Sequence, residues 1–302
     1  MVNLWAWTDE TGLSHAGMSH GPTGEALDLA YADARIDSID TLWRLFGGPN
    51  LVHTLETWWQ RVSQRVPIPE SRLGVPVALT ECWAAGVTYA MSRDARVEET
   101  QGAEAFYRKV YDAQRPELFF KAPGTRVVGP GAEVGLRRDS RWQVPEPELT
   151  LVLDPEGQLF GFTIGNDMSS RDIEGENLLY LPQAKIFHHS AAIGPSLVLA
   201  ETLDPRNLEI RMVIERQDRV LFDGRITTAQ MRRTPEELTR YLCMEWPIEG
   251  WTALMTGTAL VPPADISLDE GDRIAITITG IGTLMNRARR IGPTWAKVPA
   301  SE

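Results

Sequence analysis

Two glutamates stand two residues apart where an apolar, strand-like run begins, in Pro145-Glu146-Pro147-Glu148-Leu149-Thr150-Leu151-Val152-Leu153. Side chains two apart on a β-strand point to the same face, so Glu146 and Glu148 are expected to converge on one spot. Prolines are tolerated at the start of a strand or on an edge strand, which fits Pro145 and Pro147. Two carboxylates this close raise each other's pKa unless a cation lies between them. The pair therefore points to a bound hard metal ion.

A third carboxylate, Asp167, follows the next apolar run, residues 159–164. Three carboxylates with no cysteine or clearly placed histidine beside them suit an oxygen-seeking cation: Mg²⁺, Mn²⁺ or Ca²⁺. The adjacent His188 and His189 are better read as surface or structural residues, because neighbouring side chains on a strand diverge.

Composition narrows the class of protein. The chain has 302 residues, 43% of them hydrophobic, with 41 acidic against 30 basic residues and a net charge of −11. An acidic chain is a poor candidate for binding nucleic acid or an anionic membrane. No apolar run approaches the roughly 18 residues of a membrane-spanning helix, and the first residues lack a signal-peptide pattern. Two cysteines give no disulfide framework. We therefore expect a cytoplasmic protein.

The hydrophobic pattern predicts two parts. Residues 1–75 form a small N-terminal α/β domain, with helices over 38–46 and 51–62, the first ending at Gly47-Gly48. Residues 76–295 form a larger catalytic domain rich in strands. A hairpin is expected over 208–226, a capped helix from Thr234, a strand over 273–279 and a polar loop over 168–177. With no alternating βαβ series, the fold class is α+β to mainly β.

Over roughly residues 80–290 the order of several motifs resembles the fumarylacetoacetate hydrolase superfamily. The motifs are Glu146-Pro147-Glu148, Gly165-Asn166-Asp167-Met168-Ser169-Ser170-Arg171-Asp172, Lys185, Gly194-Pro195, Thr256-Gly257-Thr258, Glu270-Gly271-Asp272 and Gly280-Ile281-Gly282-Thr283-Leu284. The resemblance implies a mixed β-roll with flanking helices, preceded by a small N-terminal domain. It also implies a homodimer or higher homo-oligomer that acts on a small 2-keto acid.

The resemblance also implies roles for individual residues. Glu146, Glu148 and Asp167 correspond to Mg²⁺ ligands, and Lys185 corresponds to the active-site lysine of the family. Arg171 and Thr258 correspond to positions on the substrate side. A dication disfavours a nearby ammonium, so Lys185 is expected to be a neutral amine that abstracts a proton beside the keto group. The alternative is that Lys185 is simply a counter-ion for the carboxylates.

Within the superfamily, the chain is most similar to the 2-keto-3-deoxy-aldonate dehydratases. The motifs that carry this are the Trp83–Tyr89 stretch, Arg93-Asp94-Ala95-Arg96, Pro116-Glu117-Leu118-Phe119-Phe120-Lys121, and the stretch from Gly175 to Lys185. The resemblance implies conversion of 2-keto-3-deoxy-D-arabinonate or -xylonate to 2,5-dioxopentanoate in pentose catabolism. Lys185 would remove a C3 proton, and the C4 hydroxyl would leave as water.

Other residues are candidates for supporting roles. The elimination needs an acid, for which Glu117 is our candidate; its alternative is a surface pair with Arg115 or Lys121. Thr88, Asn177 and Gln183 are candidates for binding the substrate, although loop polarity alone would explain Asn177 and Gln183.

Two other functions stay open. Acylpyruvate-cleaving hydrolases of the superfamily carry a water-activating His and Glu on a lid. Here Ser92 or a neighbour takes the place of the histidine, and no histidine lies between His53 and His188. A C–C bond hydrolase would need Glu98, Glu99 or Glu117 to activate water. A non-catalytic keto-acid binding relative is the weaker alternative, because a buried carboxylate trio without a working metal is costly to keep charged.

Overall fold

A long, mixed β-sheet runs through the molecule. The computed structural model describes residues 1–90 and 110–290. In order across the sheet, its strands are β4 (Val66–Pro67), β3 (Glu25–Asp28), β2 (Ser14–His20), β1 (Val2–Thr8), β13 (Ala191–Leu199), β11 (Leu159–Asp167), β10 (Pro147–Leu153), β16 (Thr252–Met255), β5 (Glu81–Gly86) and β6 (Glu117–Pro123), with β7 (Val127–Val128) beside β13. The sheet therefore runs without interruption from the N-terminal strands to the strands of the later part of the chain.

A second, five-stranded sheet packs against the middle of the first. Its strands, in order, are β15 (Arg219–Thr227), β14 (Glu209–Arg216), β17 (Arg273–Ile278), β18 (Gly282–Arg289) and β8 (Glu133–Gly135), and a separate pair is formed by β12 (Ser169–Ser170) and β9 (Gln143–Val144). Alternate residues of β14 and β17, such as Ile210, Met212 and Ile276, are buried against Leu149 and Ile164 of the large sheet. The core between the sheets therefore packs directly against β10 and β11.

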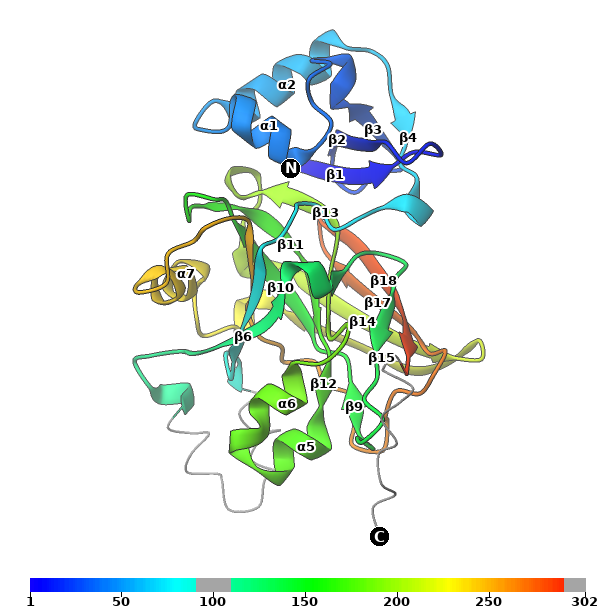
Figure 1. Ribbon diagram of the computed structural model, residues 1–302, viewed down its shortest axis with the longest axis vertical. Helices are drawn as coiled ribbons and strands as arrows, with labels where there is room; N and C mark the ends of the chain where they lie inside the picture. Colours follow the sequence, from blue (N-terminus) through cyan, green and yellow to red (C-terminus); the bar gives the residue numbers. More distant parts are fainter. Residues whose placement is uncertain (91–109, 291–302) are drawn as a thin grey trace.

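Short helices flank the sheets. The α-helices are α1 (Ile39–Phe46), α2 (Leu51–Arg61), α5 (Arg171–Glu176), α6 (Leu181–Lys185) and α7 (Pro235–Cys243); the 3-10 turns are η1 (Leu29–Tyr31), η2 (Glu70–Arg72), η3 (Gly124–Arg126), η4 (Leu178–Tyr180), η5 (Ala200–Thr202), η6 (Pro205–Asn207) and η7 (Thr228–Gln230). In Figure 1 the helices α1 and α2 lie at one end of the molecule beside the N-terminal strands, and α5 and α6 lie towards the other end. None of the described helices has the length and apolarity needed to cross a lipid bilayer.

Most of the predicted elements are confirmed. Ser38 caps α1 by accepting a hydrogen bond from the Thr41 amide, and Thr234 caps α7 through the Glu237 amide. The β14–β15 hairpin and strand β17 lie where the alternating pattern placed them. The mainly β architecture with flanking helices is therefore confirmed.

One local prediction is wrong. The expected polar loop over 168–177 contains the helix α5. Six residues are too few for a helix to be stable on propensity alone, so its stability comes from tertiary contacts. The Arg171 amide donates to the Trp142 carbonyl, and the Asp172 carboxylate accepts from Ser140 Oγ and the Arg141 amide. None of these partners is visible in the local sequence.

Candidate active site

Two neighbouring strands bring the three predicted carboxylates together. Glu148 lies at the start of β10 with Glu146 just before it, and Asp167 ends the antiparallel neighbour β11, where Glu148 is paired with Gly165. Each carboxylate offers an oxygen within 4.8 Å of the others, and all three residues are buried. The predicted convergence of Glu146, Glu148 and Asp167 is confirmed.

The environment of Glu148 shows the electrostatic cost of this arrangement. Burial raises the pKa of Glu148 well above its ordinary value, and the nearby carboxylates of Asp167 and Glu146 raise it further. One oxygen is stabilised by the Gly257 amide, which donates to Glu148 Oε2 over 2.6 Å. Gly257 has a φ of 93°, and a Cβ there would lie 2.1 Å from Thr88 Oγ1, so the position requires glycine.

The donor set fits a hard divalent cation. All three groups are carboxylates, which Mg²⁺ and related ions prefer. They are crowded in a buried site where a cation would relieve the repulsion that raises the pKa of Glu148. An open cavity lies beside them, so space remains for a substrate. The residues present therefore fit a resident Mg²⁺ ion.

Lys185, the last residue of α6, places its ammonium group among these carboxylates. Its Nζ donates to Glu146 Oε2 over 2.6 Å and to Asp167 Oδ2 over 2.8 Å, and also to Ser169 Oγ. The ring of Phe119 also lies close to Lys185, with its centroid 5.7 Å from Nζ. Lys185 also lines the adjacent cavity. It is thus a partner of the carboxylates and is also within reach of a ligand.

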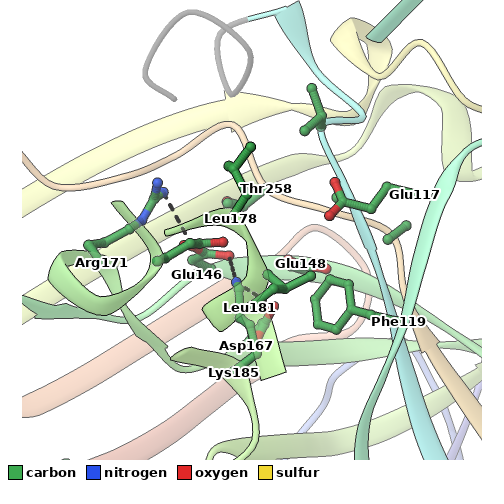
Figure 2. A pocket seen from close by; sticks show the side chains of 14 residues that line it. Glu117, Phe119, Glu146, Glu148, Asp167, Arg171, Leu178, Leu181, Lys185 and Thr258 are labelled. Carbon is green, nitrogen blue, oxygen red and sulfur yellow. Dashed lines mark hydrogen bonds and ion pairs between the residues drawn. The ribbon is translucent and has the colours of Figure 1, made fainter. Parts of the chain in front are cut away.

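A small cavity of about 120 Å³ opens over the carboxylates. It is lined by Ala85, Gly86, Val87, Glu117, Phe119, Glu146, Glu148, Asp167, Arg171, Glu174, Leu178, Leu181, Lys185 and Thr258. Figure 2 shows the Glu117 carboxylate directed into this space from β6, with the acidic cluster on the other side. Arg171 begins α5, and its Nη2 lies 3.2 Å from Glu146 Oε1. The predicted residues Glu117, Arg171, Lys185 and Thr258 therefore share one cavity with the three carboxylates.

Three other predicted substrate contacts do not line it. Thr88 is buried, and its hydroxyl donates to the Thr256 carbonyl over 2.7 Å, which supports the turn that holds Glu148. Asn177 is exposed and caps η4 by accepting from the Leu179 amide. Gln183 is exposed, and its backbone carbonyl accepts a hydrogen bond from Arg137 Nη1. Within the described residues, their contacts are with protein groups, and binding of substrate by them stays a prediction.

Histidine is not part of the cavity lining formed by the described residues. His188 is exposed and stacks on His189, with ring centroids 4.0 Å apart. His189 Nδ1 lies 3.1 Å from the Glu133 carbonyl oxygen. The interpretation of this pair as structural fits these contacts. The glutamates proposed for a hydrolase, Glu98 and Glu99, lie outside the described residues.

Two buried residues beside the carboxylates were not among the predicted site residues. Glu174 is 5% exposed and lines the cavity. Lys121 is fully buried, and its Nζ lies 2.6 Å from Asp167 Oδ1. A surface pair between Lys121 and Glu117 is therefore wrong, because the charge of Lys121 is directed at Asp167. For Lys121 the sequence held two signals: a charged residue at the end of the apolar segment 118–120, and the alternate spacing with Glu117 and Phe119 that places all three on one strand face.

Comparison with known proteins assigns the family. Residues 82–289 match the model described as fumarylacetoacetate (FAA) hydrolase, C-terminal. The chain belongs to the fumarylacetoacetate hydrolase family. The family and fold that the motifs predicted are thereby confirmed.

Two curated relatives in this family carry dehydratase names. A "Probable 2-keto-3-deoxyxylonate dehydratase" of Haloferax volcanii is 49% identical over 213 residues, which cover 70% of this chain and 73% of that protein. A 2-dehydro-3-deoxy-D-arabinonate dehydratase of Saccharolobus solfataricus is 42% identical over 236 residues, covering 77% and 79%.

Solved structures show the same likeness over nearly the whole chain. The apo form of 2-keto-3-deoxy-D-arabinonate dehydratase superposes with a TM-score of 0.79 at 35% identity, covering 97% of this chain and all of that one. A structure of that enzyme complexed with magnesium and 2,5-dioxopentanoate gives a TM-score of 0.77 at 35% identity, with 96% and 100% coverage.

Proposed function

We propose that this chain catalyses the Mg²⁺-dependent dehydration of a 2-keto-3-deoxy sugar acid, such as 2-keto-3-deoxy-D-arabinonate or -xylonate, to 2,5-dioxopentanoate. The observation that carries the proposal is one cavity lined by three converging carboxylates, Lys185 and Glu117. The dehydratase names of the relatives, and the magnesium and product bound in a similar structure, support it.

The carboxylates of Glu146, Glu148 and Asp167 would hold the metal ion. When bound, Mg²⁺ supplies a Lewis acid that polarises the carbonyl of a 2-keto acid. Mn²⁺ and Ca²⁺ share the preference for oxygen ligands and are the alternatives. We favour Mg²⁺ because the similar structure contains it.

Two side chains would move the protons. In the deprotonated form, Lys185 Nζ accepts a proton from C3 of the substrate. Glu117, which enters the cavity from β6, donates a proton to the C4 hydroxyl, which leaves as water. The double bond left between C3 and C4 then shifts to C4–C5 as C5 loses one proton and C3 gains one. The resulting enol transfers its hydroxyl proton to C4 and becomes the aldehyde of 2,5-dioxopentanoate. One water leaves for each substrate consumed.

Two further lining residues are proposed to contact the substrate. Arg171 is 1% exposed and carries a fixed positive charge beside Glu146, which suits a substrate carboxylate. Thr258 offers a hydroxyl in the same cavity.

Direct assays separate this function from C–C bond hydrolysis. The purified protein is incubated with Mg²⁺ and 2-keto-3-deoxy-D-arabinonate, 2-keto-3-deoxy-D-xylonate or acetylpyruvate in parallel. We expect 2,5-dioxopentanoate from one or both sugar acids and no cleavage of acetylpyruvate. Cleavage of acetylpyruvate to acetate and pyruvate, with both sugar acids unchanged, would instead assign a hydrolase. If all three compounds bind but none reacts, the chain is a keto-acid binding relative.

We also propose that the protein works as a cytoplasmic homodimer. The family resemblance supports the dimer, and the two cysteines, both free in the structure, suit a reducing compartment. Light scattering after size-exclusion chromatography tests the assembly: we expect twice the mass of one chain, and the mass of a single chain would rule out the dimer. Cell fractionation tests the location.

A further inference from the structure

Lys121 lies against the acidic cluster and joins Asp167 to two backbone carbonyls. It is fully buried, and its Nζ lies 2.6 Å from Asp167 Oδ1 and donates to the Met168 carbonyl over 2.9 Å. It also donates to the backbone carbonyl of Lys185. Two of the three N–H donors of this ammonium group have backbone carbonyl acceptors, and the Asp167 carboxylate forms an ion pair with its charge. The ring of Phe187 lies over it, with its centroid 5.5 Å from Nζ.

Lys121 lies at a β-bulge of strand β6. In the β5–β6 pair, Cys82 is opposite Ala122 and Trp83 is opposite Phe120, so Lys121 is the extra residue without a register partner. A bulge of this kind bends the strand and re-aims one side chain, and such bulges are common next to active sites. Glu117, Phe119 and Lys121 are alternate residues of β6 and therefore share one face of the strand. Glu117 and Phe119 line the cavity, and Lys121 lies against Asp167.

The backbone acceptors of Lys121 belong to the two segments that carry the chemistry. Lys185 is the last residue of α6, where helix carbonyls lack partners within the helix, and a cation there is favourable. Met168 directly follows Asp167 at the end of β11. One ammonium group therefore joins the carboxylate of Asp167, the backbone beside it and the backbone of Lys185.

We propose that Lys121 is a positioning residue. It holds the Asp167 carboxylate and the backbone of Lys185 at fixed positions relative to each other, so that the metal ligand and the lysine amine are correctly oriented. This proposal rests on the proposed function, in which Asp167 is a metal ligand and Lys185 is the base. Lys121 itself does not line the cavity formed by the described residues.

The test compares Lys121→Met, which has no donor, with Lys121→Arg, which keeps the charge and donors on a longer, planar group. The matched control is Arg216→Met. Arg216 also binds a fully buried carboxylate, Asp272, over 2.8 and 2.7 Å, and donates to the Ser267 carbonyl. It lies on β14, away from the cavity lining. For each protein we measure the thermal midpoint, kcat, KM and the Mg²⁺ dissociation constant by calorimetry.

Lys121→Met should lower kcat and weaken Mg²⁺ binding, each by about 10- to 100-fold, as for other groups that orient metal ligands. Loss of a positive charge alone would tighten binding of a dication, so weaker binding reports lost orientation. Arg216→Met should keep both values within about threefold of wild type, because it leaves the site untouched. Lys121→Arg should recover part of the Mg²⁺ affinity.

The proposal is overturned if Lys121→Met keeps wild-type kcat and Mg²⁺ affinity, or if Arg216→Met loses as much of both. Should Lys121→Met not fold, Lys121→Gln, which also removes the charge, is measured in its place: reduced kcat and Mg²⁺ affinity support the proposal, and wild-type values of both overturn it. If the wild-type protein binds Mg²⁺ but does not dehydrate the sugar acids, the proposed function fails, whereas the Mg²⁺ affinities still test Lys121.

Discussion

Charge balance explains the arrangement of single residues in the site. Three buried carboxylates are interleaved with the side chains of Lys121, Lys185 and Arg171, each within 3.2 Å of a carboxylate oxygen. Such a cluster is stable only when its charges are paired and hydrogen-bonded. The three basic side chains differ in what they contact. Lys185 and Arg171 line the cavity, whereas Lys121 donates to backbone carbonyls. This difference separates groups that can meet substrate from one that supports them.

Replacing Lys185 tests the proposed base. Lys185→Met keeps the length of the side chain but removes the amine, so kcat should fall by about 10²- to 10⁴-fold, the usual contribution of a general base. The Mg²⁺ dissociation constant, measured by calorimetry, should not rise, because the change removes a competing positive charge from Glu146 and Asp167. Full turnover by Lys185→Met would leave the residue with the role of counter-ion alone.

The raised pKa of Glu148 predicts a pH dependence of metal binding. A carboxyl whose pKa is raised keeps its proton at pH values where an ordinary glutamate has lost it. The metal needs the ionised form, so Mg²⁺ affinity should fall as the pH is lowered through the raised pKa of Glu148. In that range binding should release a proton, which calorimetry in buffers of different ionisation enthalpy measures. Affinity independent of pH from neutrality down to about pH 5 would contradict this.

Strands β5 and β6 show how single elements place the catalytic groups. Gly86 is paired with Glu117 in the register, and a Cβ on Gly86 would lie 2.2 Å from Glu117 Oε2. The glycine therefore leaves the space that the Glu117 carboxylate occupies. Because the clashing atom is the end of a flexible side chain, a methyl group at position 86 should displace Glu117 and leave the strands paired.

Gly86→Ala should therefore reduce activity more than stability. We expect kcat to fall by about 100-fold, the effect of moving a catalytic group by about an ångström. Glu117→Gln should show a loss of similar or larger size, and the double variant should add little, because both changes act on one group. Gly24→Ala is the control, since a Cβ there meets no atom within 4 Å. Wild-type kcat in Gly86→Ala would argue against the acid role of Glu117.

Local patterns predicted the parts of the site that depend on strand alternation. Glu146 and Glu148 were found because a two-residue spacing before an apolar run has one simple geometric meaning. Lys121 shares the face of Glu117 and Phe119 by strand alternation, but its burial against Asp167 is a tertiary contact that no local pattern shows. Helix α5 was not found either, because its stability comes from Ser140, Arg141 and Trp142 rather than from its own residues. The sequence therefore did not predict features that depend on tertiary contacts, or short elements that are stabilised by distant residues.

At the scale of the whole molecule, the N-terminal part shares a sheet and a core with the rest. Strand β1 pairs with β13 through Asn3 with Val198, Leu4 with Leu197 and Trp5 with Ser196. A single core cluster contains residues from both parts, including Leu4, Leu42, Val152 and Leu197. That residues 1–75 and 76–295 form two separate domains therefore stays a prediction.

Thermal unfolding tests whether the two parts are independent. Because they share a sheet and a core, we expect one calorimetric transition, with van't Hoff and calorimetric enthalpies that agree. Mg²⁺ at about 100 times its dissociation constant should stabilise the protein by about 2.7 kcal/mol and shift that whole transition. Two transitions, of which only the second responds to Mg²⁺, would show that residues 1–75 unfold independently.

Proton NMR of a single reaction, followed through chelation and restoration of the metal, tests the central claim most directly. Wild-type protein is mixed with 2-keto-3-deoxy-D-arabinonate and Mg²⁺, then with excess EDTA, and finally with excess Mg²⁺. We predict one 2,5-dioxopentanoate formed for each substrate consumed, arrest of the reaction on chelation, and its return with Mg²⁺. Turnover that continues after chelation would contradict a metal-dependent dehydratase built on Glu146, Glu148 and Asp167, as would a product other than 2,5-dioxopentanoate.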